Sequence, residues 1–217
     1  MTPGRAFWVL LLQLLLAPSL VSHPHSRDRR IVIVTSGEEK EENRARLAAT
    51  GEAIAFWNQT LSELQLSLRL AEARVLVAKP VVRRLEGYTR QVWNLAGRAV
   101  PAGTTPTPPP ELEALKGDVV VFFSKQRIFS FAWPLAERTR FFVGIQTDTA
   151  PPLSYSNVSR NVIAHELGHT LGLEHNGPTS TLMCGPCEHL LYRSERPMFF
   201  PLTPQERARL RQRHVLR

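Results

Sequence analysis

The stretch VIAHELGHTLGLEHNGPTSTLM, residues 162–183, constrains the fold of this 217-residue chain more than any other segment. It contains His165, Glu166 and His169 in the pattern H-E-x-x-H. Residues four apart lie one above the other on an α-helix, so the two histidines share a face and can hold one metal ion, with Glu166 beside them. The opposite face carries Ile163, Leu167 and Leu171, which are expected to anchor this helix in the core.

The residues that follow extend the pattern to H-E-x-x-H-x-x-G-x-x-H. Gly172 and His175 complete it, and Met183 comes eight residues after the last histidine. Gly172 can take a positive φ at low cost, so we expect it to end the helix and to let His175 turn back as a third nitrogen ligand. A structural histidine pair on a buried helix is the alternative, but the added residues at fixed offsets favour a metal site.

Three neutral imidazoles with an open fourth position are typical of a catalytic zinc site, whereas a structural site usually has a fourth protein ligand. Zinc activates water and polarises a carbonyl oxygen. Glu166 is then the expected general base, which takes a proton from the water and gives it to the leaving amine nitrogen. The residues therefore predict one catalytic Zn²⁺ ion, held by His165, His169 and His175, and hydrolysis of an amide.

The rest of the chain reads as alternating strands and helices. A stretch with helical apolar spacing at residues 41–66 predicts a long helix packed on a sheet. The run DVVVFF at residues 118–123 is continuous enough for a strand covered on both faces. Further strands are expected at residues 31–34, 68–77, 128–133 and 140–145. This order predicts an α+β (α/β-like) fold with a mixed twisted sheet, a long backing helix and the zinc-binding helix.

The length suits a single catalytic domain, which we place at residues 31–217. Residues 79–117 are expected to form a Pro-rich surface insertion, helical around residues 82–95 and then extended through the prolines. We place this insertion within one domain because the strands on both sides of it are needed to complete one core.

Residues 1–22 have the layout of a secretory signal peptide, with Arg5 before an apolar run and small or polar residues before Ser22. The apolar run is shorter than the roughly 20 residues of a transmembrane helix, and a retained membrane anchor is the alternative. We expect cleavage near Ser22, a flexible lead-in at residues 23–30, and a secreted or periplasmic protein without a stable membrane anchor.

Cys184 and Cys187 are the only cysteines, too few for a fold stapled by disulfides. They stand in the sequence CGPC directly after Met183. Three alternatives follow: a local disulfide, two free thiols, or a sequence that only resembles a redox motif. A redox motif would need a strand before it and a helix after it, and neither is evident. Export favours the local disulfide.

The formal net charge is +8. Much of the excess lies near the C-terminus, at Arg207, Arg209, Arg211, Arg213 and Arg217. Such a cluster can attract nucleic acid, anionic lipid or an acidic polymer, but a charge run by itself is weak evidence. We therefore expect a solvated face of a terminal helix and no nucleic-acid partner.

The zinc motif resembles that of the metzincin zinc endopeptidases. The match covers HELGHTLGLEH and the following TLM, and the interval from His175 to Met183 is most similar to the matrixin branch. The resemblance implies that Met183 underlies the zinc site as the methionine of the Met-turn without binding the metal. It also implies that FFPLTPQERARL contains the C-terminal helix, with Thr203 as its cap and Pro204 in its first turn.

The resemblance further implies a substrate that lies extended along an edge strand, here the strand expected at residues 128–133. The predicted substrate contacts are Ile128, Phe129, Ser130 and Phe131. The segment after Met183 would form the wall of a specificity pocket. In this chain that segment is CGPC, which is unlike the matrixin sequence, and Gly185 stands where some metzincins have a tyrosine.

Two further departures from the matrixin pattern change what we expect. No cysteine precedes the zinc motif, so a propeptide thiol cannot occupy the zinc. No histidine lies between His25 and His165, so no second, structural zinc is expected, and the residues make no prediction about calcium.

Two functions are consistent with these features. The first is a secreted, monomeric, matrixin-like zinc endopeptidase that acts on protein or peptide substrates. The second is a non-catalytic secreted binding protein on a metzincin scaffold, which holds an anionic partner through its basic C-terminal helix. Glu166 favours the enzyme, because a protein that cleaves nothing has no chemical need for that carboxylate.

Overall fold

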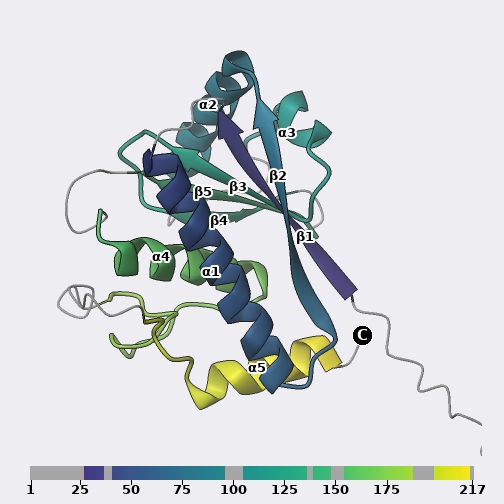
Figure 1. Cartoon of the computed structure of the whole chain (residues 1–217), viewed down its shortest axis with the longest axis vertical. Coiled ribbons are helices and arrows are strands. Elements are labelled where there is room, and N and C mark those ends of the chain that lie inside the picture. Colours follow the sequence, from purple (N-terminus) through teal and green to yellow (C-terminus); the bar gives the residue numbers. More distant parts are fainter. Residues whose placement is uncertain are drawn as a thin grey trace, which may run out of the picture.

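A five-stranded sheet separates two groups of helices (Figure 1). The computed structural model describes residues 27–36, 41–95, 105–135, 139–147, 154–187 and 198–215. The strands are β1 (Arg27–Ser36), β2 (Leu68–Val77), β3 (Val119–Ser124), β4 (Phe131–Pro134) and β5 (Phe141–Gln146). They lie in the order β2-β1-β3-β5-β4, and only the edge strand β4 runs antiparallel to its neighbour. The fold class expected from the sequence, a mixed sheet with helices against it, is confirmed.

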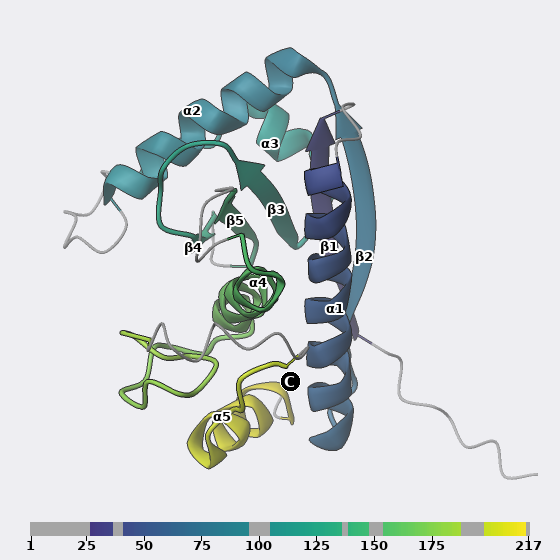
Figure 2. The same ribbon diagram turned by 60° about the vertical axis from the view of Figure 1, so that its left-hand side comes forward.

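Helices cover both faces of this sheet (Figure 2). They are α1 (Glu41–Glu63), α2 (Lys79–Leu95), α3 (Pro110–Ala114), α4 (Ser156–Thr170) and α5 (Pro204–Val215). Helices α1 and α4 pack on one face, and α2 and α3 pack on the other. Within the described ranges, no helix combines the length and the apolar character needed to cross a bilayer.

The central strands are apolar on both faces because each face is covered. In β1, Ile31 and Ile33 face the cluster under α1 and α4, whereas Val32 and Val34 face the cluster under α2. Strand β3 divides its side chains in the same way, which is the period of two expected for a strand. This burial explains why the continuous apolar runs of the sequence are strands.

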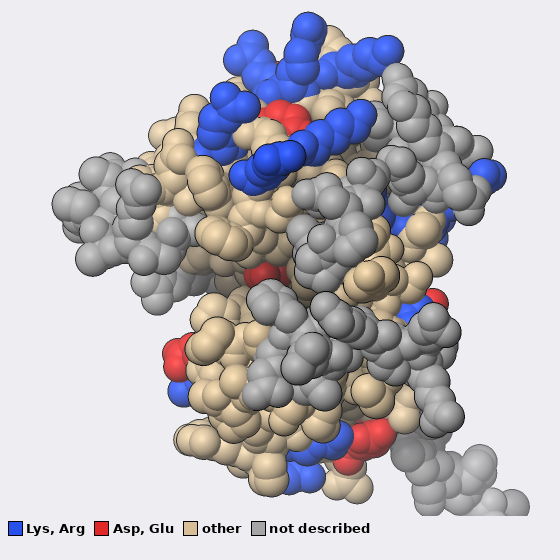
Figure 3. Space-filling view, turned by 90° about the vertical axis from the view of Figure 1, so that its left-hand side faces the viewer, with Lys and Arg blue, Asp and Glu red and all other residues tan. Residues whose placement is uncertain are grey.

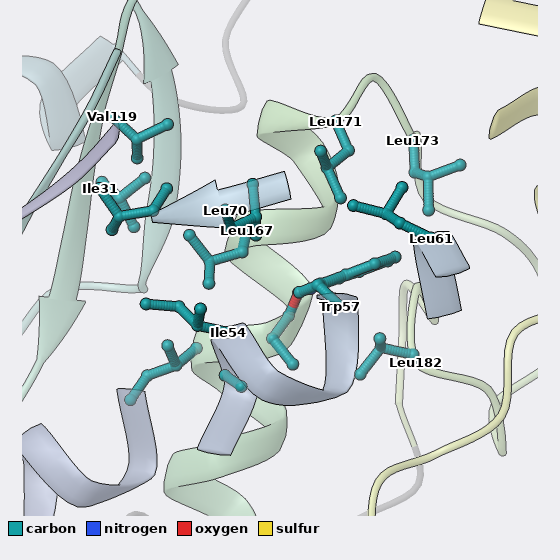
Figure 4. Packing of buried hydrophobic residues seen from close by; sticks show 14 of the residues in the cluster. Ile31, Ile54, Trp57, Leu61, Leu70, Val119, Leu167, Leu171, Leu173 and Leu182 are labelled. Carbon is teal, nitrogen blue, oxygen red and sulfur yellow. The ribbon is translucent and has the colours of Figure 1, made fainter. Parts of the chain in front are cut away.

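The indole of Trp57 holds α4 against α1 (Figure 4). Trp57 is fully buried, and its Nε1 donates a hydrogen bond of 2.9 Å to the carbonyl oxygen of Ala164. Leu61 and Ile54 on the same face of α1 pack into the same cluster. The helix that carries the histidines is therefore attached to the longest helix of the fold by apolar packing and by a buried hydrogen bond.

The interpretation of residues 79–117 as a surface insertion is wrong for α2. Leu85, Tyr88 and Val92 are buried in the cluster on the second face of the sheet, and the Tyr88 ring lies edge-on to Phe142 at 5.3 Å. Helix α2 crosses from β2 to β3 and completes one of the two cores. Its opposite face is exposed and carries Arg83, Arg84 and Arg90.

Two strand boundaries also differ from those expected. Strand β1 begins at Arg27 because it pairs with β2 along its whole length, so residues 27–30 belong to the sheet and not to a lead-in. Strand β4 begins at Phe131, where pairing with β5 starts opposite Gly144, and not at Ile128. The signal peptide expected at residues 1–22 lies outside the described residues.

Candidate metal centre and cleft

Helix α4 ends at Thr170, one residue after the second histidine of the motif, as the glycine in the pattern predicts. Gly172 has a φ of +93°. Its backbone N–H donates to the carbonyl oxygen of His169 at 3.0 Å, and the N–H of Leu173 donates to that of Gly168 at 3.1 Å. This pair of hydrogen bonds is a Schellman motif, which reverses the chain and satisfies carbonyl groups at the helix end. The reversal returns His175 to the same side as the first two histidines.

The three histidine side chains converge on one point. The Nε2 atoms of His165, His169 and His175 lie 3.1 Å from one another in all three pairs. His165 and His169 come from successive turns of α4, and His175 comes from the loop that follows the helix. Within the described ranges, these three residues are the group of histidine, cysteine and acidic side chains that can hold a metal ion.

Backbone carbonyls set the orientation of two of these rings. His165 Nδ1 donates to Leu182 O at 2.7 Å, and His169 Nδ1 donates to Leu173 O at 2.9 Å. With the proton on Nδ1, each neutral ring presents the lone pair of Nε2 to the other, so these two Nε2 atoms cannot hydrogen-bond to each other. Nitrogen atoms bound to a tetrahedral zinc at about 2.0–2.1 Å lie about 3.3 Å apart, and the observed triangle fits such an ion.

Burial keeps the two helical histidines neutral. Desolvation lowers the pKa of His165 to about 4, with a smaller contribution from His169 nearby. Desolvation also lowers the pKa of His169. Neutral imidazole is the form that binds a metal ion. Both rings are thus ready to accept a cation near neutral pH.

Glu166 is buried next to the histidines. It is only 6% exposed, and burial raises the pKa of its carboxyl group to about 8. It nevertheless lines the same cleft as His169 and His175. A carboxyl group at this place in the cleft can accept a proton from a water molecule and release it again, which is the role of a general base that later acts as an acid.

Met183 lies under α4 and packs against Gly168, the residue before His169. It is fully buried, and a Cβ atom added to Gly168 would be 2.6 Å from the Met183 sulfur and 3.0 Å from Trp57 Cζ2. Glycine at position 168 therefore permits the thioether and the indole to pack directly on the helix backbone. Met183 Sδ thus packs on the backbone of the helix that carries His165 and His169.

The loop after His175 is tied to the segment after Met183. Asn176 N donates to Met183 O at 2.8 Å, and Gly185 N donates to Asn176 O at 3.1 Å. A Cβ atom on Gly185 would lie 2.9 Å from His175 Cγ, so the backbone of this segment packs against the third ring. Cys184 and Cys187 form a disulfide that closes the turn, with their Cα atoms 5.1 Å apart.

The first turn of α5 supports this loop through a residue that the sequence interpretation missed. Thr203 caps α5, as expected, because its Oγ1 accepts a hydrogen bond of 3.2 Å from Glu206 N. Glu206 Oε2 accepts one of 2.7 Å from Thr203 N, which completes a capping box. The spacing T-P-Q-E is the sequence signal for the box, but nothing in the sequence shows that Glu206 also reaches Asn176.

A cleft of about 490 Å³ runs between the triad and the edge strand. Phe129, Ser130 and Phe131 line it together with Trp93, whereas Ile128 is buried in the cluster under α2 and does not line it. In Figure 3 a hollow crosses the middle of the molecule, with acidic atoms at its bottom and many Lys and Arg side chains above it. Three of the four predicted substrate contacts are thus beside the metal-binding group.

Known proteins are similar to this chain in one segment of sequence and in fold. A family model described as Met-zincin matches residues 154–184, which contain α4 and the three histidines. No curated protein is significantly similar to the chain in sequence. The Met-zincin match agrees with the metzincin resemblance of the motif, and the matrixin-like branch stays a prediction.

Two solved structures are among those with a similar fold. Archaemetzincin from Methanopyrus kandleri matches over 89% of this chain and 99% of its own, with 17% identity and a TM-score of 0.47. A chaperone-substrate complex matches over 74% of this chain and 28% of its own, with 19% identity and a TM-score of 0.45.

Proposed function

We propose that this chain is a zinc-dependent endopeptidase in which His165, His169 and His175 hold one zinc ion and Glu166 is the general base. One observation carries the proposal: three Nε2 atoms converge at 3.1 Å, two of them oriented by carbonyl groups, beside a buried carboxyl group in an open cleft. Histidine ligands with no fourth protein ligand are typical of a catalytic zinc and not of a structural one.

When bound, zinc would supply Lewis-acid activation of a water molecule and of the scissile carbonyl group. Glu166 accepts the proton of the attacking water and then gives it to the leaving amine nitrogen. The carbonyl groups of Leu182 and Leu173 keep His165 and His169 in the tautomer that binds metal. The products are a carboxylate and an amine, so the reaction is hydrolysis of a peptide bond.

The edge strand supports a peptide as the substrate. Among the described strands, β4 has a neighbour on one side only, and its residues line the cleft that contains Glu166. An extended peptide can pair with such an edge through main-chain hydrogen bonds. Strand β4 is short and ends at Pro134, which has no N–H group, so only a few substrate residues can pair with it.

We extend the proposal to the place of action and to the branch of the family. The signal-peptide layout of residues 1–22 supports an enzyme that acts outside the cytoplasm, and a monomer is the proposed state. The interval from His175 to Met183 supports a matrixin-like enzyme. The second function, a binding protein that uses α5, has less support because Arg207 and Arg209 form ion pairs with Glu63 and Glu174, at 3.1 and 2.9 Å.

Digestion of casein or of a peptide mixture by the zinc-loaded protein tests the proposal. We expect Glu166→Gln to reduce cleavage by about 10²–10⁴-fold while zinc content stays near one equivalent. Glu174→Gln is the matched control, because that carboxylate adjoins His175 but pairs with Arg209 at the surface. Cleavage that persists in Glu166→Gln, or that is lost equally in Glu174→Gln, would contradict the assigned role.

A further inference from the structure

We infer that Trp93 and Phe129 form a subsite for a bulky apolar side chain of the substrate, close to the scissile bond. The inference rests on the proposed function and adds a class of substrate to it: peptides with an aromatic or large aliphatic residue beside the cleaved bond.

The side chain of Phe129 is exposed to solvent although phenylalanine is one of the most apolar residues. It is 81% exposed, more than any other exposed large hydrophobic residue within the described ranges. Its neighbours in the sequence behave normally, since Ile128 and Phe131 are buried at 4% and 7% exposure. A single exposed apolar residue is ordinary on a protein surface, but Phe129 lines the cleft together with Trp93, and ligand sites are mostly lined by apolar and aromatic side chains.

Trp93 provides the second ring from a different element. It lies near the end of α2 and packs against the cluster that holds Leu85 and Val92, so its position is set by the core. The centroids of the Trp93 and Phe129 rings are 6.4 Å apart, and their planes are tilted by 41°. The rings therefore do not stack flat on each other, and each presents its own apolar surface to the cleft.

No positively charged side chain in the described lining of the cleft would attract an acidic substrate side chain to Trp93 and Phe129. Its lining among the described residues contains no lysine or arginine, although Lys and Arg side chains are abundant above the hollow in Figure 3. Trp133 and Phe141 extend the apolar wall from the two rings. The same cleft contains Glu166 and His175, so a side chain held here belongs to a residue near the scissile bond.

Phe129 lies two residues before the start of β4, so the two rings adjoin the edge to which the substrate would add. Successive side chains of an extended peptide point to opposite sides. A peptide paired with β4 thus directs alternate side chains toward the wall formed by Trp93 and Phe129. A side chain of the bound peptide is therefore the proposed occupant of the subsite.

Cleavage of a randomised peptide library by the zinc-loaded protein tests the subsite. We expect enrichment of Phe, Trp, Leu or Met at one position beside the cleaved bond. Phe129→Ser and Trp93→Ala should each lower kcat/KM for a peptide with Phe at that position by about tenfold or more, and leave a peptide with Ser there unchanged. Val215→Ser, which replaces a side chain that is 65% exposed on α5, is the control and should keep the preference.

A binding measurement separates this inference from the proposed function. The zinc-loaded Glu166→Gln variant should bind the Phe peptide more tightly than the Ser peptide, and Phe129→Ser in that background should abolish the difference. Glu166-dependent cleavage without an apolar preference, or with a preference unchanged in both ring variants, overturns the subsite alone. A wild-type protein that neither cleaves nor discriminates between the two peptides overturns the proposed function and the subsite together.

Discussion

Asn176 Nδ2 donates a hydrogen bond of 2.6 Å to Glu206 Oε1 and so links the residue after the third histidine to the first turn of α5. The other carboxylate oxygen of Glu206 accepts from Thr203 N, so a single buried side chain both caps the helix and orients the loop. Thr181 Oγ1 completes the arrangement by donating to Asn176 Oδ1 at 2.9 Å. The position of His175 therefore depends on the C-terminal helix.

Glu206→Ala should weaken zinc binding, because the loop that carries His175 loses its support. Removal of groups that orient metal ligands typically reduces affinity by about 10–100-fold. Competition with a chelating dye measures this affinity. Thr203→Ala is the matched control: it removes the helix cap, at a cost of about 1 kcal/mol, but leaves the contact between Asn176 and Glu206 in place. Equal losses of zinc affinity in the two variants would attribute the effect to the helix cap.

Gly185→Ala should displace the third histidine without unfolding the protein. The added Cβ would lie 2.9 Å from His175 Cγ, closer than such contacts normally allow, and the exposed ring can move. We expect weaker zinc binding and a nearly unchanged free energy of unfolding for the metal-free protein. Gly177→Ala, in the same loop, has nothing within 4 Å of its added Cβ and should bind zinc normally. Unaltered zinc affinity in Gly185→Ala would show that the backbone at residue 185 moves and that the ring of His175 stays in place.

Gly168→Ala should destabilise the core beneath the metal site. Its Cβ would approach the Met183 sulfur to 2.6 Å and Trp57 Cζ2 to 3.0 Å, and both side chains are fully buried. Overpacking of this kind costs about 1–3 kcal/mol, which urea denaturation measures. Gly87→Ala lies on α2 with nothing within 4 Å and should be neutral or stabilising, by up to about 1 kcal/mol. Similar effects at the two glycines would contradict the packing of Met183 on α4.

Removal of the metal should lower the melting temperature of the protein. Zinc at about 100 times its dissociation constant adds about 2.7 kcal/mol to the free energy of unfolding, which shifts the melting temperature of a chain of this size by about 5–10 °C. Scanning calorimetry with and without a chelator measures the shift. His175→Ala should abolish it. His214→Ala should retain it, because His214 bonds to Leu171 O outside the triad. A shift that survives in His175→Ala would place the metal elsewhere.

The sequence by itself determined the features that depend on short intervals along the chain. The spacing of His165 and His169 places them on one face of a helix, Gly172 adopts the positive φ that ends it, and Thr203 caps α5. Each of these follows from local geometry. Residues four apart lie on the same face of a helix, glycine has no Cβ atom to oppose a positive φ, and the threonine hydroxyl lies near a free N–H group of the first helical turn. The mixed sheet was predictable as well, because apolar runs and periodicity are properties of single elements.

Only the tertiary structure decided which distant elements meet. The apolar face of α2 is visible in the sequence, but its role in the core arises because the chain crosses to the second face of the sheet between β2 and β3. Asn176 meets Glu206, and Trp93 meets Phe129, through packing of segments that are separate in the sequence. Side-chain contacts between such segments depend on the positions of whole helices and strands. These positions cannot be deduced from the spacing of residues within one short segment. The grouping of the three histidines was therefore readable from the sequence, whereas the contact that supports the loop of His175 and the aromatic wall of the cleft were not.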